Sequence, residues 1–177
     1  MAGGVEILDA RAPGGPGLER LQAVLEAALG RPVRVGRAPL DLAAAFDRGR
    51  QQYNSTALLA QVLSRPGIEG ERRIAVVDVD LFIPVLTFVF GEAQLNGPAA
   101  VVSTHRLHNE FYGEPRDEVL LGDRLAKEIV HELGHTLGLL HCRQFECVMR
   151  SSTYVEEIDL KRVEFCPACR DRILPNA

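Results

Sequence analysis

The sequence lacks any long apolar run, and this absence argues against a membrane-spanning helix. The longest apolar stretch, LFIPVLTFVF, has ten residues (81–90), whereas a helix needs about 20 to cross a bilayer. The first residues, MAGGVEILDA, contain neither a basic segment nor the apolar core of a secretory signal. The sequence therefore favours a cytoplasmic location and no contact with membranes.

An excess of positive charge is missing as well. The 177 residues carry a formal net charge of −4, which gives no electrostatic reason to expect nucleic acid as a partner. Residues 139–177 have six Lys or Arg and six Asp or Glu, so a nucleic-acid-binding zinc ribbon is disfavoured. The chain is 46% hydrophobic, which is enough for the core of one domain.

Cysteine is absent from most of the chain and is confined to its C-terminal part, at Cys142, Cys147, Cys166 and Cys169. In a reducing compartment such a cluster indicates a metal site before it indicates disulfides. Two close pairs with a longer interval between them are typical of a closed four-cysteine zinc site, which is structural because no ligand position stays open. Disulfide bonds and a redox-active C-P-A-C motif are the alternatives.

The segment HELGHTLGLLH, residues 131–141, has the pattern of a catalytic zinc site. Residues four apart share a helix face, so His131 and His135 can bind one ion. Glu132 lies one step round the helix, where its carboxylate can act on a water molecule without binding the metal. Gly138 can end the helix in a left-handed conformation, and the chain can then return His141 as the third ligand.

Histidine pairs four residues apart are common on helix surfaces and usually have no function. Here the complete motif fixes five positions, three of them histidine, and this favours the catalytic zinc. The remaining histidines, His105 and His108, are interpreted as surface or rim residues.

Strands and helices alternate along the segment 1–138. Apolar patterns predict strands at 5–9, 32–36 and 96–107, and helices at 18–29, 54–67 and from 117 or 123 to 137. Residues 72–82 and 83–91 are β-rich, and Pro84 indicates an edge or a break between them. This order predicts an α/β or α+β fold in which a mixed twisted sheet is covered by helices. The segment that follows, 139–177, has few large apolar side chains and is expected to need a metal for stability.

At these residues the sequence resembles the archaemetzincin family. HELGHTLGLLHC followed by FECVM and FCPAC combines a metzincin zinc motif with a cysteine directly after the third histidine and a terminal C-x-x-C. Less specific similarity lies at 50–59, 80–93 and 101–107, so the resemblance covers most of the chain.

The resemblance implies one metzincin-like catalytic domain, 1–177. It comprises an upper subdomain, 1–138, that ends in the active-site helix, and a small lower subdomain, 139–177, held by the four-cysteine zinc. It also implies two zinc ions per chain and a methionine turn beneath the catalytic zinc ion. Met149 is the only candidate for the methionine of this turn. Met149 is expected to support the histidines and not to bind the metal.

The expected activity is hydrolysis of peptide bonds in a peptide or protein substrate, with Glu132 as the general base. We expect the substrate to add as an extra strand beside AAVVSTHRL, residues 99–107. Endopeptidase and aminopeptidase action are not distinguished by the sequence, and neither are the natural substrate and the oligomeric state. The alternative is a zinc-stabilised peptide- or protein-binding module with weak or vestigial hydrolytic activity, although a purely structural site has no need of Glu132.

Overall fold

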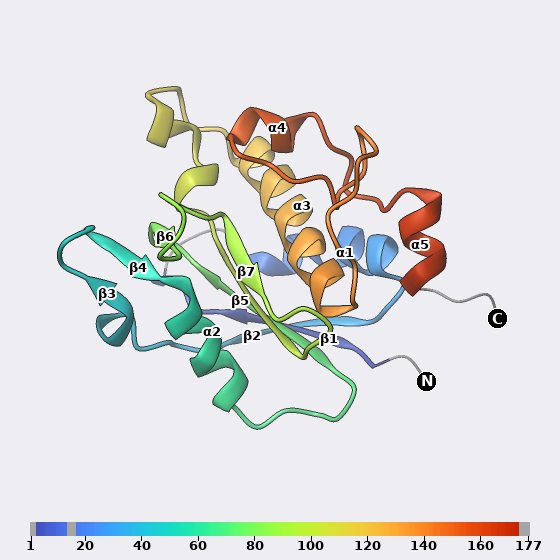
Figure 1. The fold of residues 1–177 in the computed structure, drawn as a ribbon, viewed down its shortest axis with the longest axis horizontal. Coiled ribbons are helices and arrows are strands. Elements are labelled where there is room, and N and C mark those ends of the chain that lie inside the picture. The colour runs from blue at the N-terminus through green and yellow to red at the C-terminus, as the bar shows by residue number, and fades with distance from the viewer. Residues whose placement is uncertain (1–2, 14–16, 174–177) are drawn as a thin grey trace.

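A five-stranded sheet organises the protein. The computed structural model describes residues 3–13 and 17–173 (Figure 1). The strands follow the order β2-β1-β5-β8-β7. They span Val33–Arg37 (β2), Val5–Asp9 (β1), Arg72–Val77 (β5), Ala99–Ser103 (β8) and Gly91–Ala93 (β7). All neighbours pair in parallel except β7, which runs antiparallel to β8 at one edge.

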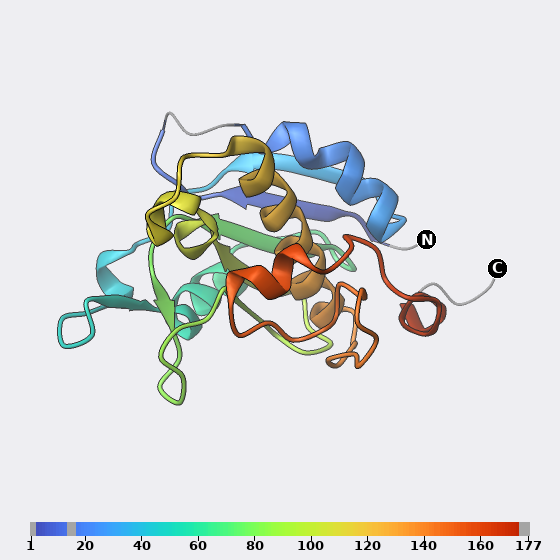
Figure 2. The same cartoon turned by 90° about the horizontal axis from the view of Figure 1, so that it is seen from above.

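Helices cover both faces of this sheet (Figures 1 and 2). The helices are α1 (Gln22–Leu29), α2 (Ser55–Ser64), α3 (Glu118–Thr136), α4 (Val155–Asp159) and α5 (Pro167–Ile173). One face packs against α1 and α3, and the other against α2. A smaller sheet beside α2 has the order β3-β4-β6, formed by Phe46–Asp47, Gln52–Asn54 and Leu81–Phe82. Short 3-10 helices lie at Leu18–Leu21, Ala43–Ala45, His105–Leu107 and Asn109–Tyr112.

The two-sided core follows from the side-chain alternation along the central strand β5. Ile74 and Val76 point into the core shared with α1 and α3, whereas Ala75 and Val77 point into the core beneath α2. All four side chains are fully buried. From Ile74 to Val77 the strand is apolar on both faces, as is typical of parallel sheets.

The segment after α3 packs into the same core as α3 itself. Its buried members include Val148, Met149, Ile158 and Phe165. Apolar burial therefore holds this segment more firmly than its composition suggested. The division into subdomains at residue 138 stays a prediction.

The sequence-based expectations hold for the α/β class and the mixed sheet. The sequence left the start of α3 open between residues 117 and 123. In the structure Asp117 is the N-cap, because its carboxylate accepts hydrogen bonds from the backbone N–H groups of Val119 and Leu120. The expectation that residues 99–107 form a docking edge is wrong. Strand β8 is enclosed between β5 and β7, and the open edge on this side of the sheet is β7.

No helix in the described ranges, 3–13 and 17–173, is both long and apolar enough to cross a bilayer.

Candidate active site

Helix α3 carries the first two histidines of the motif on one face near its C-terminal end. Gly138 follows with φ of +90°, a left-handed conformation that glycine adopts without strain. The N–H groups of Gly138 and Leu139 cap the helix by donating to the carbonyls of His135 and Gly134, at 2.9 and 3.0 Å. This turn brings His141 back beside the helix. The ring centroid of His141 lies 5.3 Å from that of His131 and 5.0 Å from that of His135.

Backbone carbonyls fix the orientation of the two helical imidazoles. Nδ1 of His131 lies 2.8 Å from the carbonyl oxygen of Val148, and Nδ1 of His135 lies 2.7 Å from that of Leu139. A carbonyl oxygen can only accept, so each Nδ1 carries the proton and each Nε2 keeps its lone pair. The two Nε2 atoms face each other at 3.2 Å. This tautomer and orientation are those of imidazole ligands supported by neighbouring groups.

The local environment favours the neutral form of all three imidazoles. Burial lowers the pKa of His131 well below its usual value, and the positive charge of Lys161 lowers it further. Burial also lowers the pKa of His135 and of His141. A neutral imidazole is the form that binds a metal.

Glu132 lies beside the three histidines without a hydrogen-bond partner among the described residues. Its side chain packs against Gly91 of β7, where a Cβ atom would come within 2.7 Å of Glu132 Oε1. Burial raises the pKa of Glu132 well above its usual range, and the nearby carboxylates Glu128 and Glu92 raise it further. A cation held by the histidines would offset this rise.

A cavity of about 330 Å³ is lined by His131, His141 and Glu132, but not by His135. This cavity, called the cleft below, has three walls. They are residues 86–91 between β6 and β7, the α3 residues Glu128, His131 and Glu132, and the later residues His141, 151–153 and Lys161. The volume lies within the range of small-ligand sites.

Met149 packs directly beneath the histidine-bearing part of α3. Its side chain is fully buried, and its Sδ atom occupies the space that a Cβ on Gly134 would need. Gly134 lies between His131 and His135 along the helix, so the methionine supports this turn from below. The position agrees with the expected role of Met149 as a support.

A buried ion pair joins the same region to α3. The Lys161 side chain is fully buried, and its Nζ lies 3.3 Å from Glu128 Oε1. It also donates to the carbonyls of Val148 and Arg150, at 3.4 and 3.0 Å, on either side of Met149. Because the Val148 carbonyl also accepts from His131, Lys161 connects the methionine segment, the helix and a histidine. Sequence analysis missed this residue because a lysine in DLKR has the appearance of a surface residue.

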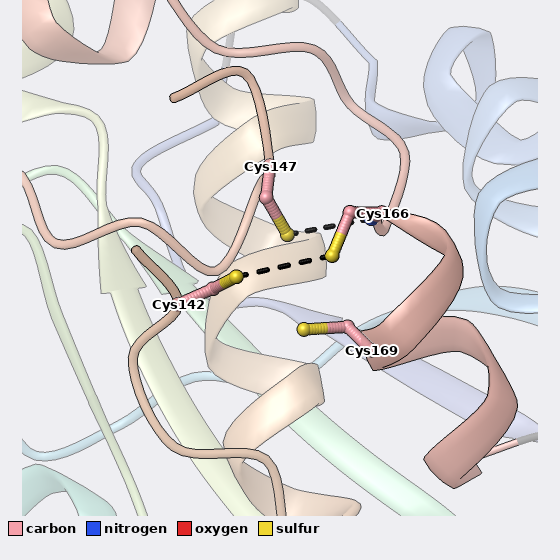
Figure 3. A group of neighbouring side chains, drawn as sticks. All are labelled: Cys142, Cys147, Cys166 and Cys169. Atoms are coloured by element: carbon pink, nitrogen blue, oxygen red, sulfur yellow. Dashed lines mark hydrogen bonds between the residues drawn. The ribbon is translucent and has the colours of Figure 1, made fainter. Parts of the chain in front are cut away.

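The four cysteines form a second cluster, between the segment after His141 and the start of α5 (Figure 3). All four are free thiols, and their sulfur atoms lie within 4.8 Å of one another. Backbone N–H groups point at two of these sulfurs, from Gln144 to Cys142 and from Cys166 to Cys147, both at 3.4 Å. Burial raises the pKa of the Cys147 and Cys169 thiols, so a cation among them is needed for all four to ionise.

In each cluster one donor–donor distance matches the value expected around zinc. A tetrahedral site with Zn–S bonds of about 2.3 Å has sulfur atoms about 3.8 Å apart, and Cys142 Sγ lies 3.8 Å from Cys166 Sγ. With Zn–N bonds of about 2.0–2.1 Å the nitrogen atoms lie about 3.3 Å apart, close to the 3.2 Å between His131 and His135. The donor sets suit an open site with three imidazoles and a closed site with four thiolates.

The other two histidines lie outside the cluster. His108 interacts with Asp78, with its Nε2 3.5 Å from the carboxylate. The hydrogen bond to Asp78 raises the pKa of His108, and His108 in turn lowers the pKa of Asp78 to about 2. His105 packs its ring against Phe111. The interpretation of both as rim or surface residues agrees with these positions.

Solved structures of known proteins share this fold. The structure of a zinc-dependent peptidase from Methanocorpusculum labreanum superposes with a TM-score of 0.85 at 32% identity, covering 96% of this chain and 100% of that one. An archaemetzincin from Archaeoglobus fulgidus, in complex with malonate, superposes with a TM-score of 0.80 at 35% identity, covering 96% and 99%. The fold and the metal-binding groups thus define a zinc metallopeptidase.

Sequence comparison identifies the family. Residues 49–174 match Peptidase family M54. The archaemetzincin of Natronomonas pharaonis is 43% identical over 133 residues, which cover 73% of this chain and 76% of the relative. That of Methanocaldococcus jannaschii is 41% identical over 129 residues, which cover 73% and 70%. The chain belongs to peptidase family M54, the archaemetzincins, and the resemblance noted in the sequence is confirmed.

Proposed function

We propose that this zinc metallopeptidase hydrolyses peptide bonds at the cleft, with zinc held by His131, His135 and His141 and with Glu132 as general base. The observation that carries the proposal is the convergence of the three imidazoles. Two of them have Nδ1 bound to a carbonyl and Nε2 directed at a common point, beside a carboxylate without a partner in the described structure.

A zinc ion in this set would lower the pKa of a water molecule to about 7 and polarise the scissile carbonyl. Glu132 then takes the proton of the attacking water and passes it to the leaving amine. Its side chain packs against Gly91 in the lining of the cleft, and this contact limits the motion of the carboxylate.

The substrate would lie extended along the open edge of β7. Glu92 is paired with Val101 of β8, and the flanking bonds join Ser103 N–H to Phe90 and Gln94 N–H to Ala99. In an antiparallel pair the intervening residues, Gly91 and Ala93, direct their N–H and C=O groups to the other side. These groups can bind the backbone of an added strand, and Gly91 lies next to Glu132.

A second, structural zinc in the four-cysteine set completes the proposal. Metal analysis of the purified protein should give two equivalents of zinc. A chelator should remove the histidine-site ion first, because that site opens into the cleft. A single equivalent together with four cysteines that react with an alkylating agent would refute the two-zinc arrangement.

The decisive test is Glu132→Ala. Loss of a general base lowers the rate by about 10²–10⁴, while zinc content should stay at the wild-type level because Glu132 is not a ligand. Glu118→Ala, on the same helix but at its distant end, is the control. Wild-type activity in Glu132→Ala would contradict the mechanism. Binding of peptides without cleavage by the zinc-loaded wild type would favour the alternative, a zinc-stabilised binding module.

A further inference from the structure

The backbone carbonyl of Val148 is contacted by two buried side chains. The Nδ1 atom of His131 donates to its oxygen at 2.8 Å, and the Nζ atom of Lys161 donates to it at 3.4 Å. No other described residue donates to this oxygen. The place of the carbonyl, and with it the orientation of the His131 ring, therefore depends on Lys161.

Lys161 is held in one position by its other contacts. Its side chain is fully buried, and its Nζ lies 3.3 Å from Glu128 Oε1 and 3.0 Å from the carbonyl oxygen of Arg150. An ammonium group has three N–H donors, so these two acceptors and the Val148 carbonyl account for all of them. A move away from any of the three would leave a buried polar group unpaired, which is costly.

The backbone that carries Lys161 is anchored to the same helix as His131. Helix α4 packs on α3 (Figure 1). Its last residue, Asp159, binds the Arg124 guanidinium of α3 through two contacts of 2.7 Å. The contacts thus form a closed path, from α3 through α4 to Lys161, on to Val148, and back to α3 at His131. A path that closes on one helix restricts the imidazole more than a contact with a free loop would.

Stability of the fold alone does not account for the Lys161–Glu128 pair. A buried ion pair often stabilises a protein no better than well-packed apolar side chains of similar volume. By its charge, a lysine this close to His131 should weaken the binding of a cation there. Any benefit of Lys161 to a metal site must therefore come from its hydrogen bonds and not from its charge.

We propose that Lys161 is a positioning residue for the histidine site. Through the Val148 carbonyl it holds the His131 imidazole with Nδ1 protonated and Nε2 free for zinc. This inference rests on the proposed function, because it treats His131 as a zinc ligand. Partners that orient a ligand in this way typically contribute about 10- to 100-fold to metal affinity.

The test replaces the ion pair by apolar side chains of similar volume, in the double variant Glu128→Met/Lys161→Met. The net charge near the site is unaltered and no buried charge is left unpaired, so the fold should persist, as circular dichroism and thermal melting would show. Only the donor to Val148 is missing. Competitive chelation should then give a zinc affinity at the histidine site about 10- to 100-fold below that of wild type. If this variant does not fold, Glu128→Leu/Lys161→Leu takes its place.

The double variant Asp123→Asn/Lys127→Met is the matched control. Lys127 is the only other lysine in the sequence, and it pairs with Asp123 on α3 at 2.6 Å. Its Nζ also reaches the carbonyl of Asp159, at 3.4 Å, but not that of Val148. This variant should keep the wild-type zinc affinity. An equal loss in both double variants would overturn the proposal, because the bond to Val148 would then have no special part.

NMR of the metal-free protein tests the same proposal without zinc. Nitrogen-15 labelling of the histidines distinguishes the protonated from the unprotonated ring nitrogen. In wild type Nδ1 of His131 should carry the proton, whereas the double Met variant should show a mixture of the two tautomers. His135 is the internal control, because its Nδ1 donates to the carbonyl of Leu139, which Lys161 does not contact.

The outcomes separate this proposal from the proposed function. Wild-type zinc affinity in the folded double Met variant, or an unchanged His131 tautomer, would overturn the positioning role. Mixed His131 tautomers already in wild type, or an equal change at His135, would overturn it as well. If both effects appear but wild type cleaves no library peptide, the positioning role stands and the peptidase function fails. Cleavage by wild type without either effect gives the reverse, and a wild type without zinc at the histidines refutes both.

Discussion

The backbone N–H of Cys142 donates a hydrogen bond to the carbonyl oxygen of Met149, at 2.9 Å. Cys142 is bonded directly to His141, the proposed third ligand, and Met149 supports the helix turn that carries the other two. The two proposed metal sites therefore share backbone, and a change at the cysteines can reach the histidines without touching them.

Cys166→Ser should weaken zinc binding at the histidine site. The four-cysteine set loses a thiolate, Cys142 loses its anchor, and His141 becomes mobile, so the effect resembles that of losing a supporting group, roughly 10- to 100-fold in affinity. Competitive chelation measures this change, with circular dichroism to show that the sheet persists. Ala168→Ser, an exposed change on the same turn, is the control. Full zinc affinity in a folded Cys166→Ser protein would show that the sites are independent.

Two glycines of α3 should respond to alanine in opposite directions. At Gly134 a Cβ would collide with Met149 and come within 3.1 Å of the Phe165 ring, so Gly134→Ala should lower the free energy of unfolding by about 1–3 kcal/mol. At Gly122 the nearest atoms are 3.7 Å away, so Gly122→Ala should stabilise the helix by about 0.5–1 kcal/mol. Urea unfolding of both variants measures the difference. Equal effects would contradict the close packing of Met149 under Gly134.

Ala93→Pro tests β7 as the docking edge. Proline removes the outward N–H of an edge residue, which an edge strand tolerates. The loss of one hydrogen bond to the substrate should raise KM by about 5-fold, with zinc content unchanged. Ala93→Val keeps the N–H and provides the comparison for kinetics on the same peptide. A KM equal to that of wild type would leave β7 without a role in binding.

Two histidines should give opposite pH dependences to the stability of the metal-free protein. Burial lowers the pKa of His131 well below 6.5. Between that lowered value and about 6.5 the unfolded chain binds the extra proton, so stability falls as pH falls, by up to about 1.4 kcal/mol per pH unit. The raised pKa of His108 acts in reverse, because its stabilisation is complete below about 6.5 and is lost as pH rises through the native value.

Urea unfolding in the presence of a chelator, at several pH values from about 5 to 7.5, measures both effects. His131→Asn should reduce the loss of stability on acidification, and His108→Asn should increase it. If the free energy of unfolding depended on pH in both variants as it does in wild type, neither histidine environment would act as described.

Local patterns in the sequence were sufficient for the parts of the site that lie close together in the chain. The helical spacing of His131 and His135 and the glycine at 138 define a turn that needs no distant contact to form. The strand positions in the sheet were harder to predict. AAVVS is apolar at four of its five positions, which is a signal for a central strand, whereas the true edge, Gly91–Ala93, is too short to recognise.

Buried polar groups were beyond the reach of the sequence. Lys161 and Glu128 are 33 residues apart, and each occurs among other charged residues. Only the packing of the last segment against α3 removes both from water. The Ser152 hydroxyl is buried without a hydrogen-bond partner among the described residues, and this too depends on the neighbours that the fold supplies. A serine in RSST carries no such information.

The position of the cysteines along the chain has a consequence for the order of assembly. Chains are synthesised from the N-terminus and fold in that direction, so the sheet and α3 can form before Cys166 and Cys169 emerge. Until those residues arrive, the proposed four-cysteine site is incomplete, and the segment that carries His141 lacks its support. In the proposed two-zinc arrangement, a nascent chain is thus folded before it is hydrolytically competent, and the peptidase becomes active only after the segment that holds its third ligand is in place.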